Sequence, residues 1–303
     1  MDYQIKHAAL LKDVVDMHLH VAPSLMNRVM DIAEIALRAD EFGYKAVVHK
    51  DHHHMTAASA TLLNKHVLAG KKVKVLGAIA LNNAVGGLRR ETVQAAVGFG
   101  VKAIWLPTVS AKNHIDFVAK TGHFPKLAHG ITLDETPIHL VDESGKCRKE
   151  IVEIFRLLAE HPGILVGAGH GDHHEINTVV EKAAEMGFAE RLVIDHPTFM
   201  LGASMDEVRH WVKLGCTIEH IAACTTQYAG AHHRHVPLEE VLEMIRIAGA
   251  RQTIISSDFG QADNRDPVAG FDCFFDELLQ NGISEKDIVT MSSVNPSRLM
   301  GLD

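Results

Sequence analysis

The chain has 303 residues, 47% of them hydrophobic, and a formal net charge of −8 with histidine counted as neutral. This length and apolar content allow a large buried core, and we expect a single domain over residues 1–303. The acidic balance argues against nucleic acid and against anionic membranes as partners, and no apolar run approaches the roughly 20 residues that cross a bilayer. We therefore expect a small-molecule substrate, and the sequence leaves formation of a homo-oligomer open.

The cysteines and the N-terminus both favour a cytoplasmic protein. The four cysteines are widely separated and form no Cys-x-x-Cys pair, which indicates reduced thiols rather than a disulfide framework. The first residues, Met1 to His7, lack the charged and apolar regions of a signal peptide. The unusual feature is the histidine content: there are 22 histidines, and many of them are clustered inside the chain.

One pattern repeats along the chain: an apolar strand, a polar turn, an amphipathic helix and a glycine. Most predicted strands are continuous Val, Ile, Leu and Ala runs, typical of parallel strands that are buried on both faces. The strands are predicted at 13–21, 46–51, 73–82, 102–109, 164–170, 192–197, 216–221 and 253–259. The helices are predicted at 29–42, 56–69, 89–99, 149–161, 174–186, 204–214, 238–248 and 271–281. The glycines expected to end them in a left-handed conformation are Gly43, Gly70, Gly100, Gly163, Gly187, Gly215, Gly249 and Gly282.

Strands that alternate with helices in this way predict an α/β fold, the (β/α)₈ TIM barrel. The alternative is an open doubly wound sheet, which would offer one crevice at a switch point, whereas here nearly every strand ends in polar groups. One segment departs from the pattern, because residues 121–148 contain short apolar runs around a turn-like Asp142-Glu-Ser-Gly145. We predict a hairpin-bearing insertion after strand 4, which is either a lid over the barrel mouth or a surface decoration.

The first predicted strand, Asp13-Val-Val-Asp-Met-His-Leu-His-Val21, carries two histidines two residues apart. Because side chains alternate across a strand, Asp16, His18 and His20 are expected on one face. Two imidazoles on a rigid element can hold one divalent metal without a loop being ordered first. A lone His-x-His is equally consistent with two half-buried strand residues, so the rest of the chain has to decide.

Polar side chains end the other predicted strands as well. In a barrel of this type the residues that finish the strands gather on one face, where catalysis takes place. Burying so many ionisable groups together is costly unless they are paired or bound to metal. Imidazole with carboxylate suits Zn²⁺, and also Mn²⁺, Fe²⁺ or Ni²⁺. These strand-end residues are His49, Lys50, Asp51, Asn82, Asn83, Thr108, His170, Asp195, His196, Glu219, His220 and Asp258.

With these residues in place, the chain resembles the amidohydrolase superfamily. The family pattern has His-x-His after strand 1, a histidine after strand 5, another after strand 6 and an aspartate after strand 8. His18, His20, His170, His196 and Asp258 match this pattern in order and in strand. The ending Val294-Asn-Pro-Ser-Arg-Leu-Met-Gly-Leu302 is similar to the Asn-Pro-Ala-Arg-Leu-Leu-Gly-Leu ending common in that family, so the resemblance spans almost the whole chain.

The resemblance implies a metal-dependent hydrolase that cleaves a C–N or C–O bond of a small amide, lactone or ester. One or two divalent ions would be bound by His18, His20 and Asp258 together with His170 or His196. We expect Zn²⁺, with Mn²⁺, Fe²⁺ or Ni²⁺ as alternatives. Such a metal lowers the pKa of bound water towards ~7. Asp258 would take the proton of that water and return it to the leaving group. His196, if it is not a ligand, would hydrogen-bond the developing oxyanion.

One position departs from the family. Binuclear members often bridge their metals with a carboxylated lysine or a glutamate from strand 4, but here that strand ends Ile104-Trp-Leu-Pro-Thr108. The closest substitute is Lys50, at the end of strand 2. Lys50 would either be carbamylated and join the metal ligands, or remain a plain cation that binds a substrate anion or pairs with Asp51. Without a bridge, a mononuclear site is the simpler expectation.

The remaining candidates are contacts to substrate and residues near the mouth. Alternation allows only one member of the pair Glu219 and His220 to point inward. His53 and His54 are expected in a solvated turn, and His114 is a further candidate for a site contact. His232, His233 and His235 would line the mouth or bind adventitious metal at the surface. The residues predicted to bind substrate are His52, Thr108, Glu219 and His220.

Three other functions remain open from the sequence. A phosphoesterase of the polymerase-and-histidinol-phosphatase type also begins with a His-x-His strand, but that fold usually has seven strands and more acidic ligands. A decarboxylase or hydratase on the same mononuclear site would use Lys50, Arg89 or Arg90 to hold a carboxylate. A metal-binding or sensing barrel without turnover is the non-enzymatic alternative, and the presence of Asp258, the expected base, argues against it.

Overall fold

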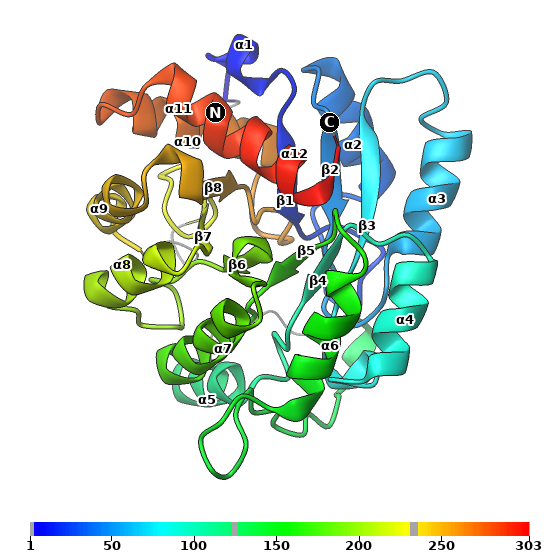
Figure 1. The fold of residues 1–303 in the computed structure, drawn as a ribbon. Helices are drawn as coiled ribbons and strands as arrows, with labels where there is room; N and C mark the ends of the chain where they lie inside the picture. The colour runs from blue at the N-terminus through cyan, green and yellow to red at the C-terminus, as the bar shows by residue number, and fades with distance from the viewer. Residues whose placement is uncertain (1–2, 123–126, 231–235, 303) are drawn as a thin grey trace.

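Eight parallel strands form one sheet in the order β1 to β8 (Figure 1). The computed structural model describes residues 3–122, 127–230 and 236–302. At the end of the sheet the N–H of Asp258 donates to the carbonyl of His18 over 2.8 Å, and the N–H of His20 donates to Phe259 over 2.9 Å. These bonds join the last strand to the first, so the predicted (β/α)₈ barrel is confirmed. The strands are β1 Val15–Leu19, β2 Ala46–His49, β3 Lys74–Ala80, β4 Ala103–Trp105, β5 Leu165–Gly167, β6 Leu192–Ile194, β7 Thr217–Ile221 and β8 Thr253–Ser256.

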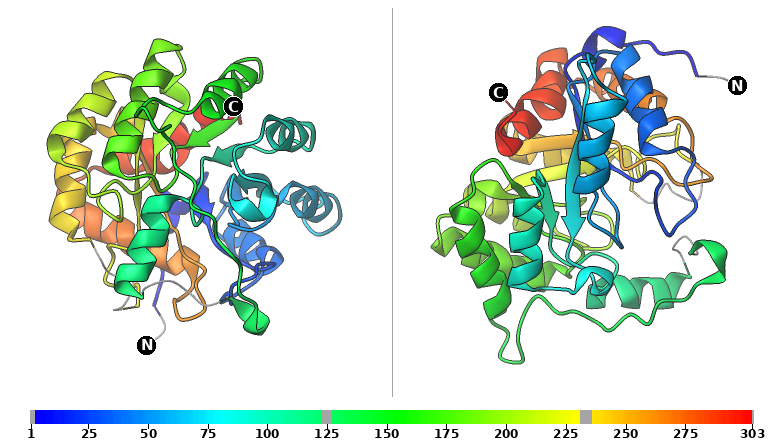
Figure 2. Two further views of the ribbon diagram at one scale, coloured as in Figure 1. Left: turned by 90° about the horizontal axis from the view of Figure 1, so that it is seen from below. Right: turned by 90° about the vertical axis from the view of Figure 1, so that its right-hand side faces the viewer.

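Helices cover the outside of the strands, as both views in Figure 2 show. Each predicted helix is present close to its expected range, and each predicted strand is present but shorter, because its polar end leaves the sheet as a loop. The helices between strands are α2 Ile32–Glu41, α3 Ala57–His66, α4 Arg90–Gly98, α5 Lys112–Thr121, α6 Lys149–Ala159, α7 His173–Glu185, α8 Met205–Lys213 and α9 Leu238–Ala248, and α10 Pro267–Gln280 follows β8. Short helices at the ends of the chain are α1 Ala8–Leu11, α11 Glu285–Val289 and α12 Asn295–Met300. Of all these, α1, α5, α11 and α12 were not predicted.

Local sequence signals set the helix ends. All the glycines predicted to end a helix have positive φ, between 68° at Gly187 and 105° at Gly215. The predicted capping box of α8 is also present: the Ser204 hydroxyl accepts the N–H of Glu207, and the Glu207 carboxylate accepts the N–H of Ser204. These signals act within one turn of chain, which is why the sequence alone locates them.

Side-chain alternation in β1 differs from the prediction. Val15 and Met17 pack inside the barrel with Trp105, whereas Leu19 packs in the outer layer between the strands and the helices. The register of β1 against β2 shifts between Asp16 and Leu19, and this irregularity breaks the alternation. Asp16 therefore does not share a face with the two histidines. Its Oδ1 instead accepts the N–H of Ser257 over 3.0 Å.

The C-terminal Asn-Pro-Ser-Arg-Leu-Met sequence forms α12 and closes the interior. Leu299 and Met300 belong to the same buried cluster as the interior side chains of the strands. The side-chain amide of Asn295 donates to the carbonyls of Ala250 (2.7 Å) and Thr253 (2.6 Å), which ties α12 to the start of β8. This ending of the chain therefore has a structural role in sealing the barrel.

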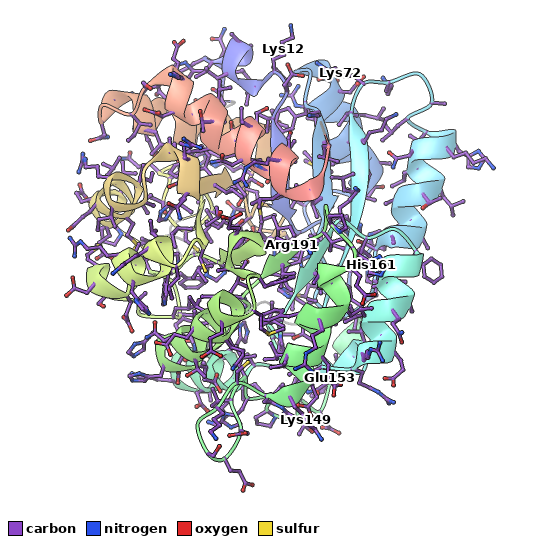
Figure 3. All side chains as sticks on the ribbon, in the orientation of Figure 1. Lys12, Lys72, Lys149, Glu153, His161 and Arg191 are labelled. Atoms are coloured by element: carbon purple, nitrogen blue, oxygen red, sulfur yellow. The ribbon has the colours of Figure 1, made fainter. Side chains whose placement is uncertain are left out.

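Loops at the starts of the strands are also tied down. Arg191, labelled in Figure 3, comes just before β6. Its guanidinium donates to the carbonyls of His161 (2.9 Å) and Ile164 (2.8 Å), and also to that of Leu158. These bonds fix the turn between α6 and β5. The rigid frame that results leaves the opposite loops to carry the site.

The connection between α5 and α6 passes across one end of the barrel, where it is drawn in green in both views of Figure 2. In its described part, residues 127–148, the predicted hairpin is reduced to one antiparallel bridge, Val141 with Cys147, around the 142–145 turn. Leu127 bridges Met26 in the loop after β1. The carboxylate of Glu135 accepts hydrogen bonds from the side chains of Asn83 (2.8 Å) and Ser110. The connection is thus anchored to the loops after β1, β3 and β4.

Within the described residues, none of the helices has the length and apolar character needed to cross a membrane.

Candidate metal centre

His18 and His20 come from β1 and from the residue just after it, and both are buried. His18 Nδ1 lies 3.1 Å from both carboxylate oxygens of Glu219, and His20 Nδ1 lies 3.0 Å from the carbonyl oxygen of Lys50. A carbonyl or a carboxylate only accepts, so each Nδ1 carries the proton. Burial lowers the pKa of His18 to about 3 and that of His20 to about 4, which keeps both rings neutral. Each Nε2 therefore presents a lone pair, as a metal ligand must.

The two Nε2 atoms converge on Asp258, which follows β8. Asp258 Oδ1 lies 3.3 Å from His18 Nε2 and 3.1 Å from His20 Nε2. Asp258 has a φ of 50°, a left-handed conformation that is uncommon for a residue other than glycine. Ligand atoms of these three residues lie within 4.8 Å of one another, an arrangement that can hold a metal ion.

A second set of ligand atoms shares His18 and adds two carboxylates, Asp195 and Glu219, again within 4.8 Å of one another. Asp195 follows β6 and is fully buried; its oxygens accept the indole N–H of Trp105 (2.6 Å) and the N–H of Gly169 (2.7 Å). Burial raises the pKa of both carboxyl groups, while Lys50 lowers it. The sequence places Asp195 at a strand end without indicating its function; its side chain lies inward because it comes two residues after Val193, whose side chain is inside the barrel.

Lys50 lies in the middle of these groups, although its side chain is fully buried. Its Nζ is 2.8 Å from His18 Nε2 and 4.4 Å from the centre of the Trp105 ring. Burial lowers the pKa of Lys50, against the attraction of Asp195 and Glu219. The amine and a metal ion would therefore compete for the same lone pair on His18.

His170 and His196 lie beside this cluster, after β5 and β6. Their ring centres are 5.1 Å apart, and the His196 ring is 6.0 Å from that of His18. His170 Nδ1 is 2.8 Å from His114 Nδ1, and its buried Nε2 has no hydrogen-bond partner among the described residues. The structure thus brings the sequence-predicted ligands together at one end of the barrel. Over the described chain, however, the two compact ligand sets include neither His170 nor His196.

The residues predicted to contact substrate occupy different places. The His52 ring is tilted against that of His20, with ring centres 4.6 Å apart, and its Nδ1 lies 2.9 Å from Thr108 Oγ1. Thr108 Oγ1 also accepts from the side-chain amide of Asn82 over 2.7 Å, a bond that the sequence did not indicate. Glu219 contacts His18, as described above. His220 follows Glu219 on β7, so it points to the other side of the sheet; neither of its ring nitrogens has a hydrogen-bond partner in the described chain.

Several weaker expectations are corrected or lie outside the structure. His53 is buried rather than in a solvated turn, because the connection after β2 folds over the barrel end; His54 is partly exposed. Arg89 and Arg90 are exposed, and Arg89 lies 3.5 Å from Glu91. His232, His233 and His235 lie outside the described residues.

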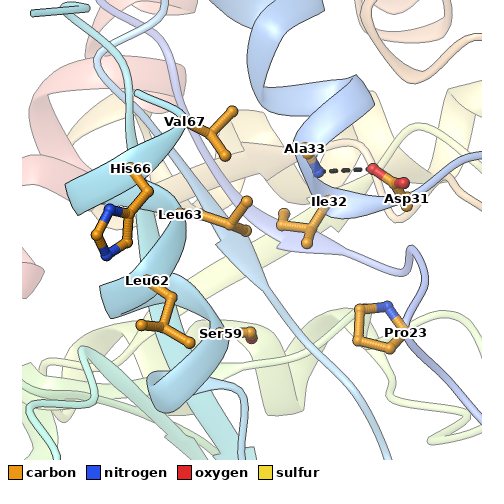
Figure 4. Close-up of a pocket in the computed structure, with 9 residues that line it drawn as sticks. All are labelled: Pro23, Asp31, Ile32, Ala33, Ser59, Leu62, Leu63, His66 and Val67. Carbon is orange, nitrogen blue, oxygen red and sulfur yellow. Dashed lines mark hydrogen bonds between the residues drawn. The ribbon is translucent and has the colours of Figure 1, made fainter. Parts of the chain in front are cut away.

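A shallow apolar groove of about 430 Å³ lies on the outside of the barrel between α2 and α3 (Figure 4). Leu62, Leu63 and Val67, in α3 and at its end, lie on one side of this groove, and Ile32 of α2 lies on the other. None of the residues that line it belongs to the cluster at the strand ends. The groove therefore plays no part in the candidate metal centre.

The fold resembles solved structures of amidohydrolase superfamily members at low sequence identity. A mutant organophosphorus hydrolase from Deinococcus radiodurans matches with a TM-score of 0.57 and 15% identity, over 99% of this chain and 98% of that chain. An amidohydrolase from Pseudomonas aeruginosa matches with 0.61 and 12%, over 97% and 99%. A probable dipeptidase from Pseudomonas aeruginosa matches with 0.63 and 12%, over 98% and 97%. The resemblance inferred from the sequence is therefore confirmed for the fold.

No curated protein sequence matches the chain. A protein-family model does match, over residues 13–219, and it is described as a family of unknown function (DUF6282). The matched range contains His18, His20, Lys50, His170, Asp195, His196 and Glu219. Since this range covers more than half of the sequence, the chain belongs to the DUF6282 family.

Proposed function

We propose that the protein is a metal-dependent hydrolase that cleaves a C–N or C–O bond of a small amide, lactone or ester. The observation that carries this proposal is the arrangement of His18, His20 and Asp258. Each histidine has its Nδ1 fixed by an oxygen acceptor, so that both Nε2 lone pairs are directed to the same carboxylate. Outer hydrogen bonds of this kind orient histidine ligands in metal sites. The donor set suits Zn²⁺, which we propose as the metal.

A divalent ion held there would activate a water molecule at neutral pH and polarise the scissile bond. Asp258 is the group we assign to accept the proton of the attacking water and to deliver it to the leaving group. His196, at the edge of the cluster, is assigned to bind either the metal or the developing oxyanion. We assign His52, whose Nδ1 lies 2.9 Å from Thr108 Oγ1, to contact the substrate.

Lys50 decides whether one or two ions bind. As a free amine, Lys50 would stay near His18, Asp195 and Glu219. Its positive charge would take the place of a second metal ion there, and the site would hold one ion. As a carbamate it would add oxygen ligands beside the second set, and the site could hold two. Intact-mass measurement on metal-loaded protein in bicarbonate separates these cases, since only a carbamate adds the mass of one CO₂.

The proposal is tested on protein purified without a metal-affinity step. Elemental analysis is expected to find one or two divalent ions per chain, and the metal-loaded protein is expected to turn over amides or lactones from a panel that also contains phosphomonoesters. Turnover of phosphomonoesters alone would support the phosphoesterase instead. If the protein retains its metal tightly but turns over none of the compounds in the panel, it is a binding or sensing protein. If it contains no metal, the proposal is rejected.

Glu219 is expected to position His18 for the metal. In Glu219→Gln the amide oxygen still accepts from His18 Nδ1, but it carries no charge. We therefore expect metal affinity to fall about 10-fold, which is the lower end of the loss seen when a group that hydrogen-bonds a ligating histidine is changed. The affinity is measured by competition with a chelator. Glu277→Gln is the matched control, because this partly buried glutamate of α10 accepts hydrogen bonds from Thr226 and Gln227, neither of which belongs to the two ligand sets. Equal metal affinity in both variants would contradict the assignment.

A further inference from the structure

Arg28 lies in the loop between β1 and α2, and this loop is fixed against the one that follows β8. The N–H of Val29 donates to the carbonyl of Gly260 over 3.0 Å, and Arg28 forms an antiparallel bridge with Gln261. The side chain of Gln261 in turn donates to the backbone carbonyl of Asp258 over 2.7 Å. Arg28 is therefore held next to the segment that carries the proposed base.

The guanidinium of Arg28 has few partners for its charge. Its Nε lies 3.3 Å from the hydroxyl of Ser24, and one Nη lies 3.5 Å from the sulfur of Met26. No carboxylate of the described residues lies within ion-pair distance of it, although the side chain is partly buried. Burial lowers the pKa of Arg28, while the charges of Asp51 and Asp258 raise it. A partly desolvated guanidinium with unfilled donors is costly unless something pairs with it.

Arg28 and the accessible part of the candidate metal centre lie at the same end of the barrel, because the loop after β1 is hydrogen-bonded to the loop after β8. Asp258 is the most exposed of the three convergent groups, with 13% of its side chain accessible against 1% for His18 and 6% for His20. Arg28 is also partly accessible; burial lowers the pKa of His20 and of His52, and the charge of Arg28 lowers both further. The guanidinium therefore lies near the accessible part of the candidate metal centre.

We infer that the substrate of this site carries an oxyanion group, a carboxylate or a phosphate, which the Arg28 guanidinium binds while the scissile bond lies at the metal centre. This inference rests on the proposed function and adds the substrate class to it. The planar fork of donors on arginine matches both kinds of oxyanion, and such charged hydrogen bonds are among the strong ones in proteins. Arg89 and Arg90, the arginines considered from the sequence, are exposed instead.

The test uses three small hydroxamates, since a hydroxamate binds a metal ion at one end and its tail can be varied. Acetohydroxamate has a neutral tail, and two longer analogues end in a carboxylate and in a phosphonate. Calorimetry on the metal-loaded protein is expected to show that one or both charged tails improve affinity about 10-fold or more over the neutral tail. The two charged probes separate a carboxylate substrate from a phosphate substrate.

In Arg28→Met this advantage of the charged tail should disappear, whereas acetohydroxamate should bind as before. Arg28→Lys should keep part of the advantage, since the charge remains but the fork is lost. Arg89→Met is the matched control, because that arginine is exposed and lies beside Glu91, and it should bind all three probes as the unchanged protein does. Elemental analysis of each variant confirms that its metal content is unchanged.

Failure of this inference is distinct from failure of the proposed function. If metal is bound and all three hydroxamates bind with equal affinity, the inference is overturned while the metal site stands. The same holds if the charged tail helps equally in Arg28→Met. If the unchanged protein holds no metal, the proposed function is rejected, and the substrate class falls with it.

Discussion

Replacing His20 by alanine is expected to leave the protein folded but almost free of bound metal. His20 supplies one of only two imidazole lone pairs in the compact set with Asp258, and the remaining pair, His18, is also approached by Lys50. Loss of a direct ligand should reduce metal affinity by more than the 10- to 100-fold that loss of an outer partner typically costs. Elemental analysis after dialysis gives the metal content, and turnover should fall in parallel.

The control for this variant is His66→Ala. His66 is an exposed histidine at the end of α3 that lines the outer groove, so its removal should change neither metal content nor activity. Circular dichroism on both variants checks that the barrel is intact. Full metal content in folded His20→Ala protein would contradict the proposed site, because the ion would then be held elsewhere.

Gly260→Ala is expected to disrupt both the fold and the site. Gly260 has a φ of +121°, and a Cβ at this position would lie 1.5 Å from the carbonyl oxygen of His20 and 2.4 Å from its carbonyl carbon. Both atoms are backbone, so no side-chain rotation relieves the contact, and the loop after β8 must move away from β1. We expect a loss of unfolding free energy of at least about 3 kcal/mol, since both backbone strain and a steric clash are involved. Denaturant unfolding measures this loss.

The same substitution at Gly70 separates the effect of backbone strain from that of the steric clash. Gly70 also has a positive φ, +79°, but a Cβ there would meet no atom within 4 Å. Gly70→Ala should therefore cost only the conformational penalty, about 1 kcal/mol, and should leave metal affinity unchanged. In Gly260→Ala, by contrast, displacement of His20 should also weaken metal binding. Similar stability losses in the two variants would show that the backbone after β8 relaxes more easily than its packing suggests.

The barrel could be predicted from the sequence because its signals are local. Buried strands appear as continuous apolar runs, and glycines such as Gly43 and Gly187 end helices with positive φ within a single turn. The capping box of Ser204 and Glu207 works over three residues. In this fold the carboxyl ends of all strands lie at one end of the barrel. The sequence alone therefore predicts that His18, His20 and Asp258 lie at that end.

Less local elements were missed for a common reason. The sequence does not predict the helix α5, which buries little apolar surface because His114 is its one buried residue. The irregular register in β1 changed the side on which Asp16 lies, because it depends on how β2 pairs with β1 and not on the β1 sequence. Similarly, the role of α12 depends on tertiary contacts, because its Leu299 and Met300 fill the interior of the barrel.

The sequence by itself determined the repeating strands and helices, the residue types at the strand ends and the chemistry that they allow. Only the tertiary structure decided which nitrogen of each histidine faces the centre, since the bond that orients His18 comes from Glu219, 201 positions later in the chain. It likewise decided that the Lys50 amine lies against His18 and that Arg28 sits beside the Asp258 loop. Such contacts join segments that are distant in sequence, and their geometry depends on strand register and loop path, which no local pattern of residues encodes.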